Sequence, residues 1–178
     1  TAARVAGAAE VDGTPGARDR AWCDAWARAG RAAADALLDA VDPGGARARG
    51  SAPPDPLSAA AAVWAAAHDG TAPTLVLGSS STVRDLDLVA GASGDVDGRH
   101  APRVFANRGL AGIDGTLATA TGLALGTGAP VRVVLGDLSF LHDAGALARG
   151  DLEADIDLQV VVLDDHGGGI FATLEHGG

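Results

Sequence analysis

The sequence contains no lysine, tyrosine or methionine, and it has a single cysteine, Cys23. One cysteine cannot form an internal disulfide, and no cysteine–histidine spacing typical of a zinc site occurs. The chain also lacks a run of about 20 apolar residues, the length needed to cross a bilayer, and it does not open on a signal peptide. From these absences we expect a cytoplasmic protein with no disulfide framework and no membrane insertion.

Positive charge is scarce in most of the chain, whose formal net charge is −10. Residues 1–50 are balanced, with seven acids and seven arginines, whereas residues 51–178 carry 16 acids against 6 arginines. An acidic surface repels the phosphates of nucleic acids and the headgroups of anionic membranes, so neither is an expected partner. An anionic ligand would need a locally built site made from helix N-termini, a cation or a few arginines.

Residues 19–41 predict one amphipathic helix, because apolar residues recur at helical spacing. This apolar stripe consists of Trp22, Trp26, Ala29, Ala33, Leu37 and Val41. Stacking of the two tryptophans on a ligand is one interpretation, and anchoring of the helix to a neighbouring domain is the plainer one. Residues 43–56 hold three glycines and four prolines, which predicts a linker between residues 1–42 and a domain at 57–178.

Beyond the linker, short apolar runs alternate with helical segments. The runs cover 74–77, 103–106, 131–135 and 158–163, and helices are predicted at 57–68, 113–125 and 140–148. The runs end about 28 residues apart, which favours βαβ units and hence a parallel α/β sheet with helices on both faces. In such a sheet the carboxyl ends of the strands share one edge, where ligands bind.

Polar residues follow each of the four runs, so four loops are expected to meet at that edge. Asp137 ends the third run, and Asp165 follows the fourth run 28 positions later. Two carboxylates brought together need a cation or a proton between them, and hard oxygen ligands suit magnesium. The glycines at 167–169 leave the backbone free to approach a phosphate closely. Each feature alone is a weak signal, because strand-end aspartates are common and a glycine run is more often a hinge.

Taken together, these residues resemble the metal-binding motif of thiamine-diphosphate enzymes. In that family a Gly-Asp ends one strand, and an asparagine-type ligand about one repeat later is followed two positions on by a carbonyl-donating residue. Gly136-Asp137 and the Asp-His-Gly sequence that begins at Asp165 are similar to this pattern. Leu138 replaces the usual glycine, and Asp165 replaces the usual asparagine. The resemblance implies that Asp137, Asp165 and the Gly167 carbonyl hold Mg²⁺, with Mn²⁺ as an alternative ion.

Three further segments resemble the menaquinone-pathway synthases of this family, the MenD branch. Residues 78–87 are similar to its Ser-x-x-x-Arg segment, 107–115 to its Asn-Arg-Gly-x-x-Gly-Ile-Asp-Gly segment, and 167–174 to its Gly-Gly-x-Ile-Phe-x-x-Leu stretch. The Gly-Asp-Leu variant is itself typical of that branch. The resemblance covers roughly residues 57–178, and the helix at 19–41 looks like the tail of the branch's central domain. The implied fold is therefore an incomplete thiamine-diphosphate-binding (pyrophosphate) domain.

The resemblance also implies roles for individual residues. Helix-start amides would face the diphosphate, a bulky apolar residue at 113 would bend the cofactor, and arginine forks would bind substrate carboxylates. The implied cofactor-binding residues are Ile113, Gly136, Asp137, Leu138, Ser139, Asp165, Gly167, Gly168, Ile170 and Phe171. The implied substrate-binding residues are Ser80, Arg84, Arg108 and Leu174. Surface ion pairs are the plain alternative for the arginines, and helix-surface or turn positions are the plainer interpretation of His142 and His166.

The reaction implied by the resemblance decarboxylates 2-oxoglutarate and adds the acyl-anion equivalent to isochorismate, in a homodimer or homotetramer. The cofactors would be thiamine diphosphate and magnesium. The family activates its cofactor with a glutamate on a pyrimidine-binding domain, and no segment here resembles that domain. The chain also stops at Gly178, before the family's last strands and helices. We therefore expect a C-terminally truncated part of a longer enzyme, with no catalytic residue in this chain and no activity in isolation.

Two alternatives remain open from the residues alone. Another thiamine-diphosphate enzyme, such as an acetohydroxyacid synthase or a 2-oxo acid decarboxylase, would share the metal motif but need not carry Arg84 and Arg108. A non-catalytic α/β phosphate-binding or interaction module would keep the fold without the chemistry.

Overall fold

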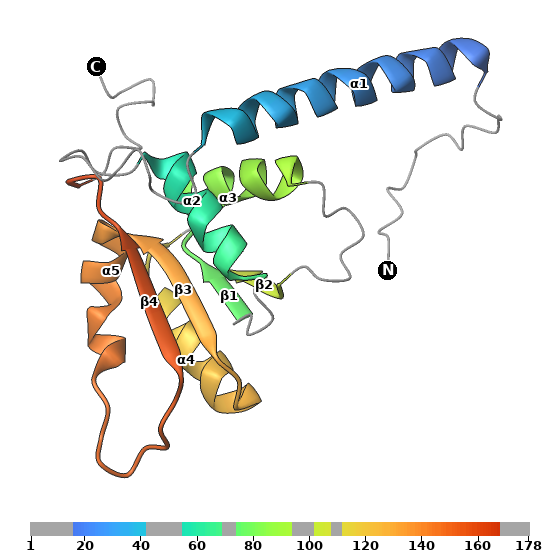
Figure 1. Cartoon of the computed structure of the whole chain (residues 1–178). Helices are drawn as coiled ribbons and strands as arrows, with labels where there is room; N and C mark the ends of the chain where they lie inside the picture. The colour runs from blue at the N-terminus through green and yellow to red at the C-terminus, as the bar shows by residue number, and fades with distance from the viewer. Residues whose placement is uncertain (1–15, 42–54, 69–73, 94–101, 108–111, 168–178) are drawn as a thin grey trace, which may run out of the picture.

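The four apolar runs form one parallel sheet in a computed structural model that describes residues 16–41, 55–68, 74–93, 102–107 and 112–167 (Figure 1). The strands are β1 (Thr74–Leu77), β2 (Val104–Ala106), β3 (Val131–Gly136) and β4 (Leu158–Leu163). Their order in the sheet is β2-β1-β3-β4, and all three neighbouring pairs run parallel. This arrangement confirms the predicted α/β fold class.

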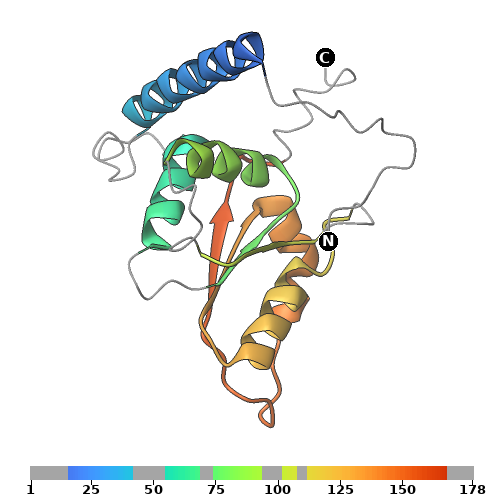
Figure 2. The ribbon, with the colours of Figure 1, turned by 90° about the vertical axis from the view of Figure 1, so that its right-hand side faces the viewer.

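Helices cover both faces of the sheet (Figure 2). One face carries α2 (Pro56–Ala66) and α3 (Ser81–Ala92), and the other carries α4 (Thr116–Thr127) and α5 (Asp137–Asp143), which continues into the 3₁₀ turn η2 (Ala144–Leu147). Successive residues of a strand point to opposite faces. Leu75 and Leu77 accordingly belong to the core under α2 and α3, whereas Val76 belongs to the core under α4. All three side chains are buried, which is why β1 has a near-continuous apolar sequence.

The first helix, α1 (Ala17–Ala40), extends away from the sheet and meets the body at its C-terminal end (Figure 1). Leu37 and the C-cap residue Val41 pack against the core under α2 and α3, but no residue within the helix is buried. Trp22 and Trp26 are 63% and 65% exposed, with ring centroids 5.8 Å apart. The apolar stripe is therefore covered along its C-terminal part alone in the described chain, and anchoring to a neighbouring domain stays a prediction.

Helix boundaries differ from the sequence prediction for local physical reasons. α2 begins at Pro56 because Asp55 caps it, accepting hydrogen bonds from the Ser58 amide at 3.0 Å and the Ser58 hydroxyl at 2.6 Å. α4 begins at Thr116, three residues later than predicted, because Gly115 adopts a left-handed φ of 76°. α5 begins at Asp137, directly after the strand and three residues earlier than predicted.

Two further differences concern the elements themselves. Residues 81–92 form α3, a helix that was not predicted, and it begins within the segment 78–87 that resembles the family. Residues 43–54 of the predicted linker lie outside the described residues, and its last residue, Pro56, is already in α2. Among the described helices, none is both long and apolar enough for a membrane span.

Candidate functional site

The turns that follow the four strands meet at one edge of the sheet. Leu77 at the end of β1 pairs with Ala106 at the end of β2, and Gly136 at the end of β3 pairs with Leu163 at the end of β4. Parallel strands that end in register place their following turns side by side. We call this the carboxyl edge, and it is the candidate functional site.

The turn after β1 begins with a close approach between two strands. The Gly78 amide donates to the Val134 carbonyl at 2.8 Å, and a Cβ added at Gly78 would lie 2.9 Å from the Leu135 Cβ. Cβ atoms in proteins essentially never come that close, so this position requires glycine. The chain then turns sharply, since the Ser80 amide donates to the Gly78 carbonyl at 2.9 Å.

The predicted substrate residues on this turn lie at the start of α3. Ser80 is the N-cap residue, and Arg84 is an exposed residue of the first helical turns. Arg84 borders a groove of about 780 Å³, whose other lining residues are Trp64, Leu77, Val83, Leu86, Asp87, Leu88, Ala90, Val104 and Ala106. Burial raises the pKa of the next residue, Asp85, and the neighbouring Arg84 charge opposes that rise. An arginine beside an apolar groove is suited to a ligand that carries both a carboxylate and an apolar part.

Hydrogen bonds join the turns after β1 and β2 to the start of α4. The Ser79 hydroxyl donates to the Asn107 carbonyl at 2.7 Å, and the Asn107 Nδ2 donates to the Gly115 carbonyl at 3.3 Å. Thr119 Oγ1 accepts from Asn107 Nδ2 at 3.2 Å and lies 2.7 Å from the Gly115 carbonyl oxygen, to which it donates. The network fixes Asn107 next to Arg108, which itself lies outside the described residues.

Asp137, the predicted metal ligand that follows β3, is the first residue of α5. Its Oδ1 accepts a hydrogen bond from the Leu138 amide at 2.8 Å. One of the two amides predicted to face the diphosphate, that of Leu138, therefore donates to the Asp137 carboxylate instead. The second amide belongs to Ser139, which is buried, and Leu138 is 42% exposed.

The turn after β4 contains two consecutive residues with positive φ. His166 has a φ of 65° and Gly167 a φ of 99°, a conformation that costs glycine little and other residues more. Aspartate side chains stabilise the turn, because Asp164 Oδ1 accepts from the His166 amide at 2.8 Å and Asp165 Oδ1 accepts from the Gly167 amide at 3.3 Å. His166 is itself highly exposed, with Nδ1 3.6 Å from Asp164 Oδ1.

The residues predicted to hold a divalent ion offer hard oxygen donors. Two carboxylates, from Asp137 and Asp165, and the Gly167 carbonyl match the ligands that magnesium prefers. Within the described part of the chain, no three His, Cys, Asp or Glu side chains gather into a group that could hold a metal ion. The predicted set has two such side chains and one backbone oxygen, so it is smaller than a group of this kind. The metal site therefore stays a prediction. The other predicted site residues, namely Arg108, Gly168, Ile170, Phe171 and Leu174, lie outside the described residues.

Two contacts near the site were not predicted from the sequence. Asp143 Oδ2, at the end of α5, accepts hydrogen bonds from the amides of Leu117 at 2.6 Å and Ala118 at 3.3 Å. The neighbouring His142 Nδ1 lies 2.6 Å from Asp114 Oδ1. Capping by a residue some 25 positions away has no local sequence pattern. The predicted position of His142 on a helix surface gave no indication of its partner.

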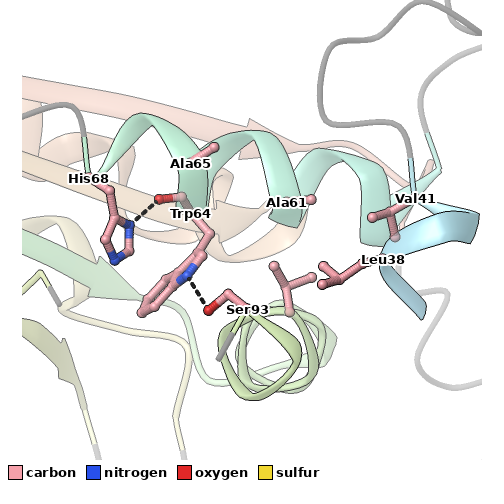
Figure 3. Close-up of a pocket in the computed structure, with 8 residues that line it drawn as sticks. Leu38, Val41, Ala61, Trp64, Ala65, His68 and Ser93 are labelled. Carbon is pink, nitrogen blue, oxygen red and sulfur yellow. Dashed lines mark hydrogen bonds between the residues drawn. The ribbon is translucent and has the colours of Figure 1, made fainter. Parts of the chain in front are cut away.

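A second pocket, of about 430 Å³, lies between the end of α1, α2 and α3 (Figure 3). It is lined by Leu38, Val41, Ala61, Trp64, Ala65, His68, Val89 and Ser93. Trp64 Nε1 donates to Ser93 Oγ at 3.2 Å, and His68 Nδ1 lies 2.7 Å from the Trp64 carbonyl oxygen, as Figure 3 shows. Because a carbonyl oxygen can only accept, that ring nitrogen carries the proton. None of these residues belongs to the predicted cofactor or substrate set.

Comparison with known proteins gives a consistent result, although no protein-family model matches the chain. The chain is 51% identical over 175 residues to the 2-succinyl-5-enolpyruvyl-6-hydroxy-3-cyclohexene-1-carboxylate synthase of Kineococcus radiotolerans, a match that covers 98% of this chain and 29% of that protein. It is 49% identical over 156 residues to the synthase of the same name from Paenarthrobacter aurescens, covering 88% of this chain and 25% of that protein.

A third synthase of that name, from Renibacterium salmoninarum, is 45% identical over 162 residues, covering 91% of this chain and 26% of that protein. The chain thus spans less than a third of the length of these curated relatives. Identity at this level along almost the whole chain extends the resemblance seen in four separate segments. The chain belongs, as a segment, to the family of 2-succinyl-5-enolpyruvyl-6-hydroxy-3-cyclohexene-1-carboxylate synthases.

Proposed function

We propose that this chain supplies the metal- and diphosphate-binding part of a thiamine-diphosphate-dependent synthase. The observation that carries the proposal is the pairing of Gly136 with Leu163. Because these two strands end in register, Asp137 and the turn at Asp165–Gly167 follow them at the same carboxyl edge. Family membership supports the proposal independently, since the relatives are named as synthases and almost the whole chain aligns with one segment of them.

The proposed reaction joins a decarboxylated 2-oxoglutarate to isochorismate. Thiamine diphosphate, when bound, would supply the electron sink that decarboxylation of a 2-oxo acid requires. The residues of this chain would bind and orient the reactants. Asp137, Asp165 and the Gly167 carbonyl would hold Mg²⁺, and Arg84 and Arg108 would bind substrate carboxylates.

The hydrogen bond within α5 fits this assignment. A carboxylate that ligates a cation no longer needs the Leu138 amide as a donor, and the amide then becomes available to a phosphate oxygen. The same cation would offset the negative charge that Asp137, Asp165 and a diphosphate bring together. The homodimeric or homotetrameric state and the cytoplasmic location stay predictions from the resemblance.

The test is a chimeric synthase, in which this chain replaces the 175 aligned residues of the Kineococcus radiotolerans relative. We expect the chimera to consume 2-oxoglutarate and isochorismate in the presence of thiamine diphosphate and Mg²⁺. Asp137→Ala should abolish turnover, whereas Asp151→Ala, which removes the same charge from an exposed loop, should leave it unchanged. A chimera that folds and binds the cofactor but does not turn over these substrates would contradict the proposed reaction.

A further inference from the structure

The short helix α5 connects two regions that the proposed function assigns to opposite ends of the cofactor. It begins at Asp137, the proposed metal ligand, and ends at Asp143. Asp143 Oδ2 accepts from the amides of Leu117 at 2.6 Å and Ala118 at 3.3 Å, both in the first turn of α4. The turn that precedes α4 carries Ile113, the proposed cofactor-bending residue.

The start of α4 depends on this contact because it has no cap of its own. Its N-cap residue is Gly115, which has no side chain to accept from the first helical amides. The Asp143 carboxylate takes that role from another element, at the positive end of the helix dipole. The contact with Leu117 is part-buried, so water competes with it less than with a surface contact.

A second contact joins the same two elements. His142 Nδ1 lies 2.6 Å from Asp114 Oδ1, and Asp114 directly follows Ile113 in the chain. The side chains of His142 and Asp114 are 56% and 75% exposed. An exposed ion pair contributes little free energy, so Asp143 should carry most of the effect and His142 should support it.

From this geometry we propose that Asp143, supported by His142, is a positioning residue that sets the place of Ile113 relative to Asp137. Neither residue is proposed to touch the cofactor. The inference rests on the proposed function, in which Ile113 contacts the organic part of thiamine diphosphate while Asp137 holds the metal and the diphosphate end. Removing the Asp143 contact should therefore weaken binding of thiamine diphosphate but not of inorganic diphosphate, which has no organic part to reach Ile113.

The test measures both ligands by calorimetry on the chimeric synthase in the presence of Mg²⁺. For Asp143→Ala we expect the dissociation constant of thiamine diphosphate to rise about tenfold, which is within the range that loss of a helix cap costs, with that of inorganic diphosphate unchanged. Asp143→Asn keeps an acceptor oxygen, and asparagine and aspartate are similar helix caps, so it should stay within about twofold of the parent. Asp151→Ala is the control for loss of one negative charge.

A double-mutant cycle identifies the route of the effect. If Asp143 acts through Ile113, combining Asp143→Ala with Ile113→Ala should weaken thiamine diphosphate no further than Ile113→Ala alone. Should Asp143→Ala fail to fold, His142→Gln replaces it, with an expected two- to fivefold loss, about the value of an exposed ion pair, again confined to thiamine diphosphate.

Three outcomes would overturn the inference. Equal weakening of both ligands would show that Asp143 maintains the fold of the whole site rather than the position of Ile113. Additive losses in the cycle would show that Asp143 acts elsewhere, and unchanged affinity in the Asp143→Ala and His142→Gln variants would show that the contacts do not matter. A parent chimera that folds but binds no thiamine diphosphate would overturn the proposed function itself, which distinguishes that failure from the other three.

Discussion

Replacing Gly78 with alanine should destabilise the sheet where the candidate site begins. The added Cβ would lie 2.9 Å from the Cβ and 3.1 Å from the Cα of Leu135, and 3.5 Å from the Val134 carbonyl oxygen. Leu135 is fully buried, and the Gly78 amide is bonded to Val134 at 2.8 Å, so the strands cannot separate without losing that bond. Overpacking of this kind costs roughly 1–3 kcal/mol, a large part of the 5–15 kcal/mol that usually stabilises a folded protein.

Gly122→Ala is a matched control, because a Cβ added at this position in α4 meets nothing within 4 Å. Alanine is more favourable than glycine inside a helix by about 0.8–1.0 kcal/mol, so this variant should be stabilised. Urea unfolding of the 178-residue chain, followed by far-ultraviolet circular dichroism, should show midpoint shifts in opposite directions and a difference of roughly 2–4 kcal/mol between the variants. A Gly78→Ala chain as stable as the parent would refute the claim that the approach of β1 to β3 requires glycine.

Three other outcomes are expected. Asp55→Ala should lower the free energy of unfolding by about 1 kcal/mol at neutral pH through loss of the α2 cap. Hydrogen bonds from Ser58 lower the pKa of Asp55, so this stabilisation is present above the unfolded-state aspartate pKa of about 3.9 and is lost as the pH falls through the folded-state pKa. Urea unfolding should therefore show the stabilities of parent and variant converging in acid. Asp85→Asn should raise the free energy of unfolding at neutral pH, since burial raises the pKa of Asp85 and its charge opposes folding there. The advantage of the variant should vanish as the pH falls through the folded-state pKa of Asp85 to the unfolded-state value. The isolated 178-residue chain should not join 2-oxoglutarate to isochorismate at any cofactor concentration, and detectable product in a chromatographic assay would show that the chain carries its own activating group.

The sheet could be predicted from the sequence because its two central strands, β1 and β3, are buried on both faces and its edge strands are also apolar. β1 and β4 begin and end as predicted, and β2 and β3 differ by one residue. Their apolar runs are short, bounded by polar, glycine or proline residues and evenly spaced, which leaves few topologies other than a parallel sheet. The convergence of the strand ends follows from that topology, so the location of the candidate site was predictable as well.

The contacts that fix the site could not be predicted, because they depend on residues far apart in the chain. Asp143 caps α4 from 26 positions beyond Leu117, and Asn107 joins β2 to Thr119. Neither contact lies within one helical turn, as the contact between Asp55 and Ser58 does, so neither has a local sequence pattern. The apolar stripe of α1 shows a related limit. Its helical spacing was clear from the sequence, but Trp22 and Trp26 are exposed in the structure, and their anchoring to a neighbouring domain stays a prediction.

The central claim is that Asp137 and Asp165 share one divalent ion with the diphosphate. Calorimetric titration of thiamine diphosphate into the chimeric synthase, with and without Mg²⁺, tests it most directly. Asp137→Ala should abolish metal-dependent binding, whereas Asp165→Asn should be tolerated, because an amide oxygen can still coordinate while the local negative charge falls by one. Metal-dependent binding that survives Asp137→Ala would contradict the account. Loss of binding in Asp165→Asn as severe as in Asp137→Ala would show that the charge of Asp165 is essential, and Asp165 would then not be a substituted asparagine ligand.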